Sequence, residues 1–386
     1  MNDKPDMKYF GGGWERVQPS DDRIESKIID IHCHIFKRFG TGSDEEYARR
    51  SLMFWQYHTR DFTTFWRKED GKRVEEMLLD YPSDDIYAMP DVQFRMGKYG
   101  QGEVTIDGVD YYVQFYPPGL ENLDAIPRRM IAEMDIAEVD IGVLQSDHVY
   151  GDVNAYYGEA RRAHPGRFVG LAQVHEWEED QTAEANRLEK AVVEHGNRGL
   201  YFSVEPLSLN HYLDHIDDSK FDPLWNKVRQ LEIPIFWYLD ARKQDRVAGF
   251  MERVAELDRW SSANPDIPSV ITHGIVPAAI IHEIGIPDSV LDILKRPNVY
   301  AEVLMPAKWP AYEYPYVEGQ EMLKALCDDI GVEKLMYGSD MPFSGAFWCT
   351  YRQSVDFIRV HCDFLSVDEK ALVLGGNAAR LLDLST

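Results

Sequence analysis

The sequence has few of the features that mark an exported, membrane-bound or nucleic-acid-binding protein. Its four cysteines are scattered and form no CxxC pair, so a disulfide framework is not indicated and a reducing cytoplasm is expected. No apolar run has the length needed to cross a bilayer, and residues 1–22 lack the basic and then apolar order of a signal peptide. Cationic residues are also in deficit, and the formal net charge is −25. A surface of that sign repels phosphates, which excludes a general nucleic-acid surface.

The chain does contain ample material for a large folded core. It has 386 residues, of which 44% are hydrophobic and 12% aromatic, enough for one large domain or two ordinary ones. We see no internal repeat and no low-complexity tract. We predict an N-terminal arm over residues 1–25 and a single domain over residues 26–386.

Residues 37–125 show no regular alternation of strands and helices, and we interpret them as a cap or insertion. Within this stretch, VTIDGVDYYVQF (Val104–Phe115) consists of two alternating runs around Asp107-Gly108, a strong β-hairpin signal. The aromatic-rich segment Ser51–Trp66 is predicted to be helical. Such an insertion is expected to cover a site or to build a subunit interface.

From about Ile126 onward, apolar strands alternate with helices, as in parallel β/α proteins. Together with the first strand there are eight predicted strands: Ile28–Phe36, Ile141–Leu144, Phe168–His175, Arg198–Glu205, Ile233–Asp240, Ser269–Gly274, Asn298–Met305 and Lys334–Phe343. Eight is the number in a (β/α)8 TIM barrel. An open, doubly wound sheet obeys the same connection rules, but polar residues at the strand ends favour the barrel.

The first strand, IIDIHCHIF, carries two histidines spaced one residue apart. Residues i and i+2 of a strand point to the same side, so His32 and His34 can converge while Cys33 faces the other way. This arrangement suits two nitrogen ligands of one metal ion. A histidine pair on a solvated strand face is the alternative interpretation.

Ligand-type side chains also follow the other predicted strands. The complete set of strand-end groups is His32, His34, Asp147, His148, His175, Glu176, Glu205, Tyr238, Asp240, His273, Glu302 and Asp340. In a TIM barrel these ends gather at one mouth. Several carboxylates in such a place repel one another unless a cation is present, so the set as a whole indicates a metal site.

The chain resembles the amidohydrolase superfamily, specifically its amidohydrolase-related branch, which includes aminocarboxymuconate-semialdehyde and resorcylate-type decarboxylases. The matching motifs occur in the family's order and span nearly the whole chain: IDIHCHIF, IPIFWYLD, ITHG, LMYGSDMPF and GGNAARLL. The resemblance implies that His32 and His34 bind a metal, zinc above all. It implies that Asp340 is a further ligand or a general base, and that His273 contacts the reacting groups.

One position departs from the family pattern. A metal-binding histidine usually follows strand five, whereas this chain has Tyr238 there. The remaining set, His32, His34 and Asp340, has two histidines and one carboxylate, which suits iron or manganese as well as zinc. The chain therefore also resembles metal-dependent oxygenases such as 2-aminoisobutyrate hydroxylase subunits. A second metal held by Glu205, His175 and His148 is left open.

These observations lead to three functional hypotheses. The first is a metal-dependent hydrolase or non-oxidative decarboxylase acting on a small carboxylated or amide-bearing compound, with Asp340 and His273 moving the proton. The second is an oxygen-dependent hydroxylase, or a subunit of one, that uses iron or manganese at the same ligands. The third is a catalytically silent partner subunit. Tyr238, His175 and Glu205 are the candidate substrate-binding residues, and a homo- or hetero-oligomer is expected.

Overall fold

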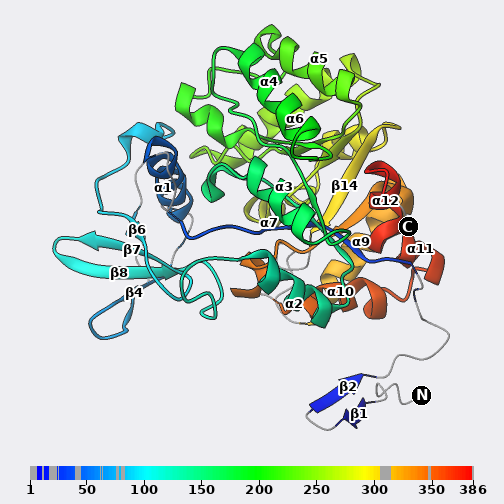
Figure 1. The fold of residues 1–386 in the computed structure, drawn as a ribbon, viewed down its shortest axis with the longest axis horizontal. Coiled ribbons are helices and arrows are strands. Elements are labelled where there is room, and N and C mark those ends of the chain that lie inside the picture. Colours follow the sequence, from blue (N-terminus) through cyan, green and yellow to red (C-terminus); the bar gives the residue numbers. More distant parts are fainter. Residues whose placement is uncertain are drawn as a thin grey trace.

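The structure, a computed structural model, describes residues 7–10, 13–16, 24, 26–39, 45–60, 62, 64–74, 78–79, 83–304, 314–346 and 349–384. Eight parallel strands lie at its centre (Figure 1). They are β3 (Ile29–Cys33), β9 (Ile141–Leu144), β10 (Phe168–Gly170), β11 (Leu200–Ser203), β12 (Ile235–Tyr238), β13 (Ser269–Ile271), β14 (Val299–Leu304) and β15 (Leu335–Gly338).

The eight strands form a barrel. Hydrogen bonds define a sheet with the order β10-β9-β3 and another with the order β11-β12-β13-β14-β15. Parallel bridges join the two sheets on both sides, Ala172 with Leu200 and Cys33 with Met341. This is the (β/α)8 architecture predicted from the sequence.

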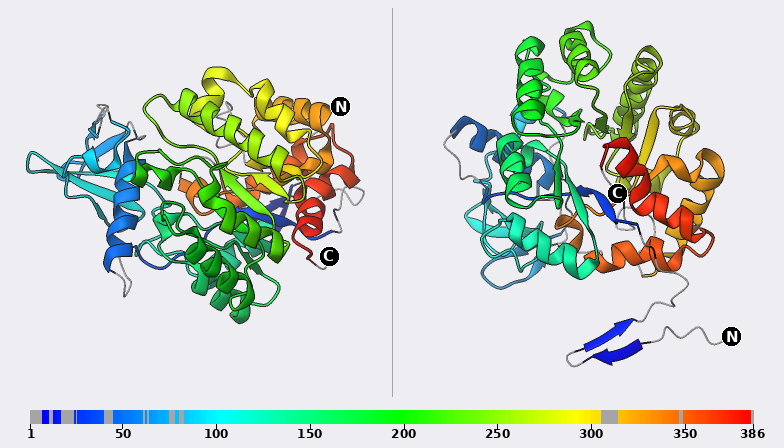
Figure 2. Two further views of the ribbon diagram at one scale, coloured as in Figure 1. Left: turned by 90° about the horizontal axis from the view of Figure 1, so that it is seen from above. Right: turned by 45° about the vertical axis from the view of Figure 1, so that its right-hand side comes forward.

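Helices surround the barrel (Figure 2). They are α2 (Pro127–Ala137), α3 (Asn154–Ala163), α4 (Gln181–Val193), α5 (Asp222–Leu231), α6 (Arg246–Ala263), α7 (Ala278–Ile284), α8 (Asp288–Leu294), α9 (Val317–Ile330), α10 (Tyr351–Asp356), α11 (Val367–Ala371) and α12 (Asn377–Leu381). Among the helices of the described residues, none is both long and apolar enough to cross a membrane.

Apolar side chains of the strands divide into an inner and an outer layer. The inner cluster fills the barrel and consists of Ile29, Ile31, Ile141, Val143, Val169, Leu171, Tyr201, Phe236, Tyr238, Val270 and Met336, with Ala378, Ala379 and Leu382 of the C-terminal segment. The outer cluster lies between strands and helices and continues into the insertion. Burial on both faces explains why the strands read as nearly continuous apolar runs.

The segment after β3 leaves the barrel and forms α1 (Glu45–Thr59) and an antiparallel sheet (Figure 1). The sheet order is β5-β4-β8-β7-β6, with β4 at Phe65–Arg67, β5 at Arg73–Val74, β6 at Arg95–Met96, β7 at Gln101–Ile106 and β8 at Val109–Gln114. The predicted hairpin is confirmed, because β7 and β8 pair around Asp107 and Gly108. Both turn residues have positive φ, 51° and 77°, which this short hairpin turn requires.

Two sequence predictions about elements are partly wrong. The predicted helix Ser51–Trp66 ends at Thr59, because Phe65 and Trp66 instead belong to β4. Phe65 pairs with β5 and Trp66 with β8, where Trp66 stacks on Tyr112 at 5.5 Å between ring centroids. The predicted strand Phe168–His175 also ends early. Leu171 and Ala172 still donate their backbone N–H groups to carbonyls of the neighbouring strands, but the N–H groups of Gln173 and His175 donate to the side chains of Asn154 and Glu184, at 2.8 Å in both cases.

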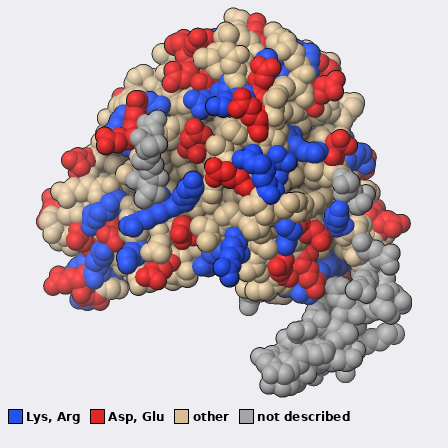
Figure 3. Space-filling view, viewed as in Figure 1, with Lys and Arg blue, Asp and Glu red and all other residues tan. Residues whose placement is uncertain are grey.

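Two further strands, β1 (Met7–Phe10) and β2 (Gly13–Arg16), pair with each other in antiparallel orientation. On the face of the molecule shown in Figure 3, acidic and basic side chains are interspersed. The net charge of −25 is therefore not concentrated in one patch on that face.

Candidate metal centre

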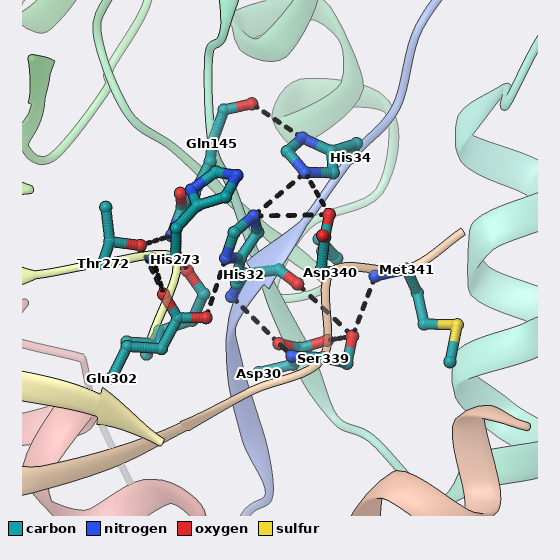
Figure 4. Close-up of polar contacts among 12 residues, drawn as sticks. Asp30, His32, His34, Gln145, Thr272, His273, Glu302, Ser339, Asp340 and Met341 are labelled. Atoms are coloured by element: carbon teal, nitrogen blue, oxygen red, sulfur yellow. Dashed lines mark hydrogen bonds and ion pairs between the residues drawn. The ribbon is translucent and has the colours of Figure 1, made fainter. Parts of the chain in front are cut away.

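Three predicted ligands lie together at the C-terminal end of the barrel. His34 Nε2 is 3.1 Å from His32 Nε2 and 3.1 Å from Asp340 Oδ1, and His32 Nε2 is 3.5 Å from the same Asp340 oxygen. All three side chains are buried, and Figure 4 shows them pointing toward one another. Two ligand atoms that share one metal ion at about 2.1 Å are separated by roughly 3.0–3.4 Å, so this spacing fits a bound ion.

The hydrogen bonds on the far side of each imidazole support the same conclusion. His32 Nδ1 donates to Glu302 Oε1 at 2.7 Å, and His34 Nδ1 donates to the Gln145 carbonyl oxygen at 3.2 Å. These bonds leave both Nε2 atoms as acceptors, and burial lowers the pKa of His34, which favours the neutral ring. Two lone pairs and a carboxylate oxygen thus face one point, an arrangement that a cation stabilises.

The backbone of strand one places the two histidines. Between Asp30 and Cys33, β3 contains one more residue than β9 beside it, a β-bulge, and bulges redirect side chains. Ile31 therefore belongs to the inner cluster and Cys33 to the outer one, while His32 still reaches the mouth.

Strand eight is attached to strand one by both backbone and side chains. Asp340 N–H donates to the His32 carbonyl at 2.7 Å, and His34 N–H donates to the Met341 carbonyl at 2.8 Å. Below the ligands, Asp30 accepts hydrogen bonds from Ser339 and from the Tyr351 hydroxyl. Burial raises the pKa of Asp30 to about 6 despite these donors.

Glu302 on β14 is the functional residue whose role sequence reasoning missed. It accepts hydrogen bonds from three groups, His32 Nδ1, the Thr272 hydroxyl and the His273 N–H at 2.6 Å. Gln145 Nε2 donates to the Thr272 hydroxyl at 2.6 Å and extends this chain across the barrel (Figure 4). The sequence did show Glu302 at a strand end, but which histidine it would orient depends on the barrel geometry.

His273 stands beside the three ligands, at the end of β13. Its ring centroid is 4.4 Å from that of His32 and 4.2 Å from that of Tyr238. Its φ is +62°, an uncommon value for a residue with a side chain, and such values concentrate at functional sites. His273 therefore lies where a molecule bound at the three ligands would meet it.

Tyr238 occupies the inner cluster and is only 3% exposed. Burial raises its pKa well above the ordinary value, so its phenol is protonated in the absence of a metal. Its ring packs against His273.

The other two predicted substrate-binding residues, His175 and Glu205, are not brought to the three ligands. Glu205 pairs with His58 of α1 at 2.7 Å and with Arg242 at 3.1 Å. His175 stacks on Trp177 at 4.7 Å, and burial lowers its pKa to about 2. The contact between Glu205 and His58 attaches the insertion to the barrel.

His148 likewise has partners other than a metal. Its Nε2 donates to Glu176 at 2.6 Å, and its Nδ1 lies 3.1 Å from the Tyr47 hydroxyl. Tyr47 donates its own proton to Gln173 Oε1 at 2.9 Å, so His148 is the donor toward Tyr47. Donation by both nitrogens indicates an imidazolium. Of the residues considered from the sequence for a second metal, His148 thus pairs with Glu176, and Glu205 with His58 and Arg242.

One further group of metal-type residues occurs among the described residues, namely His215, Glu252 and Glu256 on and beside α6. Glu256 already accepts from His215 at 2.6 Å and from Arg253 at 2.8 Å, and Glu252 accepts from Lys243 at 2.6 Å. Because protein cations compensate these carboxylates, the group is an ion-pair network.

Comparison with known proteins supports this description. The amidohydrolase family model matches residues 29–384, and no curated protein matches the sequence significantly. Similar solved structures include 5-carboxyvanillate decarboxylase from Sphingomonas paucimobilis, with 18% identity, 94% of this chain and 100% of that chain covered, and a TM-score of 0.57. A probable 2-pyrone-4,6-dicarboxylic acid hydrolase from Acinetobacter baumannii has 19% identity, covers 67% of this chain and 90% of that chain, and has a TM-score of 0.53.

A third similar structure is a dihydroxybenzoic acid decarboxylase from Polaromonas sp. JS666, solved with bound manganese and the inhibitor 2-nitroresorcinol. It has 17% identity, covers 68% of this chain and 87% of that chain, and has a TM-score of 0.50. At such identities the likeness shows a shared fold. The family match spans nearly the whole chain and includes all three clustered ligands, so the chain belongs to the amidohydrolase family.

Proposed function

We propose that this chain is a metal-dependent decarboxylase that removes a carboxyl group from a small aromatic or unsaturated acid without an oxidant. The observation that carries the proposal is the convergence of three acceptor atoms, His32 Nε2, His34 Nε2 and Asp340 Oδ1. Hydrogen bonds at the other nitrogen of each imidazole orient the two histidines. Two of the similar structures are named as decarboxylases of aromatic acids. Hydrolysis of a small carboxylated compound is the second candidate, favoured by the likeness to the pyrone dicarboxylic acid hydrolase.

The residues of the chain have distinct roles in the proposed reaction. His32 and His34 would hold a divalent ion through Nε2, and Glu302 keeps His32 in the required tautomer. The ion would supply electrostatic stabilisation of the negative charge that forms as the bond to the carboxyl carbon breaks. Carbon dioxide leaves, and the carbon that carried it takes a proton. Asp340 and His273 lie on either side of His32 and are the proposed proton carriers.

The identity of the metal is part of the proposal. Zinc is the expectation from the family resemblance, whereas manganese is the ion named for the Polaromonas structure. Two histidines with one carboxylate accept either ion. None of the similar structures described above is named as a hydroxylase, so an iron-dependent hydroxylase has less support than a decarboxylase.

Metal analysis combined with an assay of acid consumption tests the proposal. Purified protein is analysed by mass spectrometry for metal per chain, then loaded with zinc or manganese and assayed for carbon dioxide release from 5-carboxyvanillate and dihydroxybenzoates. We expect about one ion per chain and turnover of at least one acid. His32→Ala is expected to lose both metal and activity while its circular dichroism is unchanged. His164→Ala, at the end of α3, is the control and should retain both.

Two results would contradict the proposal. Full metal occupancy in His32→Ala would show that the ligand assignment is wrong. Stoichiometric metal in the unsubstituted protein without turnover of any aromatic or unsaturated acid would exclude the reaction while leaving the metal site intact.

A further inference from the structure

Tyr201 is a buried tyrosine whose hydroxyl lacks a hydrogen-bond partner within the described part of the chain. It is the second residue of β11, is 0% exposed and belongs to the inner cluster of the barrel. A buried hydroxyl without a partner is unfavourable, because the group has lost its hydrogen bonds to water. The native protein is therefore expected to supply this hydroxyl with an acceptor that is not a protein group.

Two other fully buried tyrosines differ from Tyr201, because their hydroxyls have hydrogen-bond partners in the protein. Tyr157, also 0% exposed, donates to the Gln145 carbonyl at 2.7 Å. Tyr337, on β15, is 0% exposed and forms a 2.5 Å hydrogen bond with Ser354 Oγ on the outer side of the barrel. The fold thus satisfies hydroxyls of the same depth elsewhere.

The Tyr201 ring lies near the mouth of the barrel, where His273 stands. Its ring centroid is 6.5 Å from that of His273, which in turn contacts His32 and Tyr238. After burial, the charges that raise its pKa include those of Asp147 and Glu205, which follow the C-terminal ends of their strands. The Tyr201 side chain therefore lies beside the group that His273 forms with His32 and Tyr238 at the barrel mouth.

We infer that Tyr201 is a substrate-binding residue whose hydroxyl donates a hydrogen bond to an oxygen of the acid bound between the metal centre and His273. This inference rests on the proposed function. A neutral phenol in an apolar barrel is a donor that prefers a charged oxygen acceptor, and a carboxylate or phenolate oxygen of the substrate provides one. Tyr201 and Tyr238 belong to the neighbouring strands β11 and β12, and the rings of both lie near His273.

Binding of a probe acid tests this inference without depending on turnover. Manganese-loaded protein is titrated by calorimetry with 2-hydroxybenzoate and with benzoate. The variant is Tyr201→Phe, which removes one oxygen atom and keeps the ring. The matched control is Tyr337→Phe, which removes a buried hydroxyl that has a protein partner outside the barrel.

Tyr201→Phe is expected to lose acid affinity without losing thermal stability, and Tyr337→Phe is expected to lose thermal stability without losing acid affinity. Tyr201→Phe should bind at least one of the two acids roughly tenfold more weakly, as expected for a lost hydrogen bond to a charged group. Its melting temperature without ligand should be unchanged or higher, because no protein hydrogen bond is lost. Tyr337→Phe should bind the acids as the unsubstituted protein does, and should melt lower by about 2 °C or more.

Each other outcome has a definite meaning. If the unsubstituted protein binds an acid and Tyr201→Phe binds both equally well, the acceptor is a buried water and the inference is wrong. If Tyr201→Phe melts as low as Tyr337→Phe, the hydroxyl has a structural role and the inference is also wrong. If the unsubstituted protein binds neither acid, the proposed function fails, and the inference that depends on it fails too.

Discussion

The link between Glu302 and His32 yields the sharpest test of the metal centre. Replacing Glu302 with glutamine keeps the size of the side chain but turns one carboxylate oxygen into an NH2 group. The carboxylate accepts from three donors, His32 Nδ1, the Thr272 hydroxyl and the His273 N–H. An amide has one oxygen only, so in either orientation its NH2 group faces at least one of these donors.

The least costly adjustment is a change of tautomer at His32. If the NH2 group faces Nδ1, that nitrogen becomes an acceptor and the proton moves to Nε2, the atom proposed to bind the metal. Loss of such an orienting partner weakens metal binding about 10- to 100-fold, or about 1.4–2.7 kcal/mol. The metal-free protein should also lose about 1.5–3 kcal/mol of unfolding free energy, because hydrogen bonds to a buried charged group are lost.

Glu256→Gln is the matched control for this experiment. Glu256 is buried to the same degree, at 1% exposed, and accepts from His215 Nδ1, the Ile216 N–H and Arg253. Metal affinity is measured by competition with a chromophoric chelator, and unfolding free energy by urea titration of the metal-free proteins. Both variants should be destabilised, and only Glu302→Gln should bind metal more weakly. Equal metal affinity in Glu302→Gln and the unsubstituted protein would refute the reasoning, as would an equal loss in the control.

Two further predictions concern Tyr238 and the pair formed by His148 and Glu176. Tyr238→His should tighten metal binding in the same competition assay, because a neutral imidazole is a better ligand than a protonated phenol; unchanged affinity would mean that position 238 does not reach the metal. For His148, burial alone lowers the pKa, but the charge of Glu176 outweighs burial and leaves the pKa raised. The pair therefore stabilises the fold fully below the unfolded pKa of about 6.5, and this contribution is lost as pH rises through the folded value. The difference in unfolding free energy between the unsubstituted protein and His148→Gln should shrink from about pH 6.5 upward, and a difference that stays constant with pH would show that His148 is neutral in the fold.

Local sequence patterns were sufficient to predict much of the architecture. Apolar runs of strand length separated by helices predicted the barrel, and Asp107-Gly108 predicted the hairpin between β7 and β8. These signals work because backbone geometry depends on nearby residues, and because a strand buried on both faces must be apolar along its length. The His-x-His spacing likewise placed His32 and His34 on one side of a strand end.

The division of the polar strand ends was decided by the tertiary structure. The strand pattern placed twelve candidate groups at one mouth, and the family resemblance singled out His32, His34, Asp340 and His273 among them. In the fold, His32, His34 and Asp340 converge with Glu302 behind them, whereas His148 and Glu205 pair with groups of α1 or with other charged residues. Which groups pair depends on distances in space between residues that lie far apart in the chain. His34 and Asp340, for example, are 306 positions apart in the sequence.

What the sequence alone determined, then, is the set of available donors and the strands that carry them. The tertiary structure decided which donors meet, through the bulge in β3, the order of strands around the barrel and the helix that the insertion places over strands two to four. The reason is physical. Buried charges are stable only when a partner of opposite charge or a hydrogen-bonding group lies close to them. The distances between such groups are set by the folded chain, and no local sequence pattern records them.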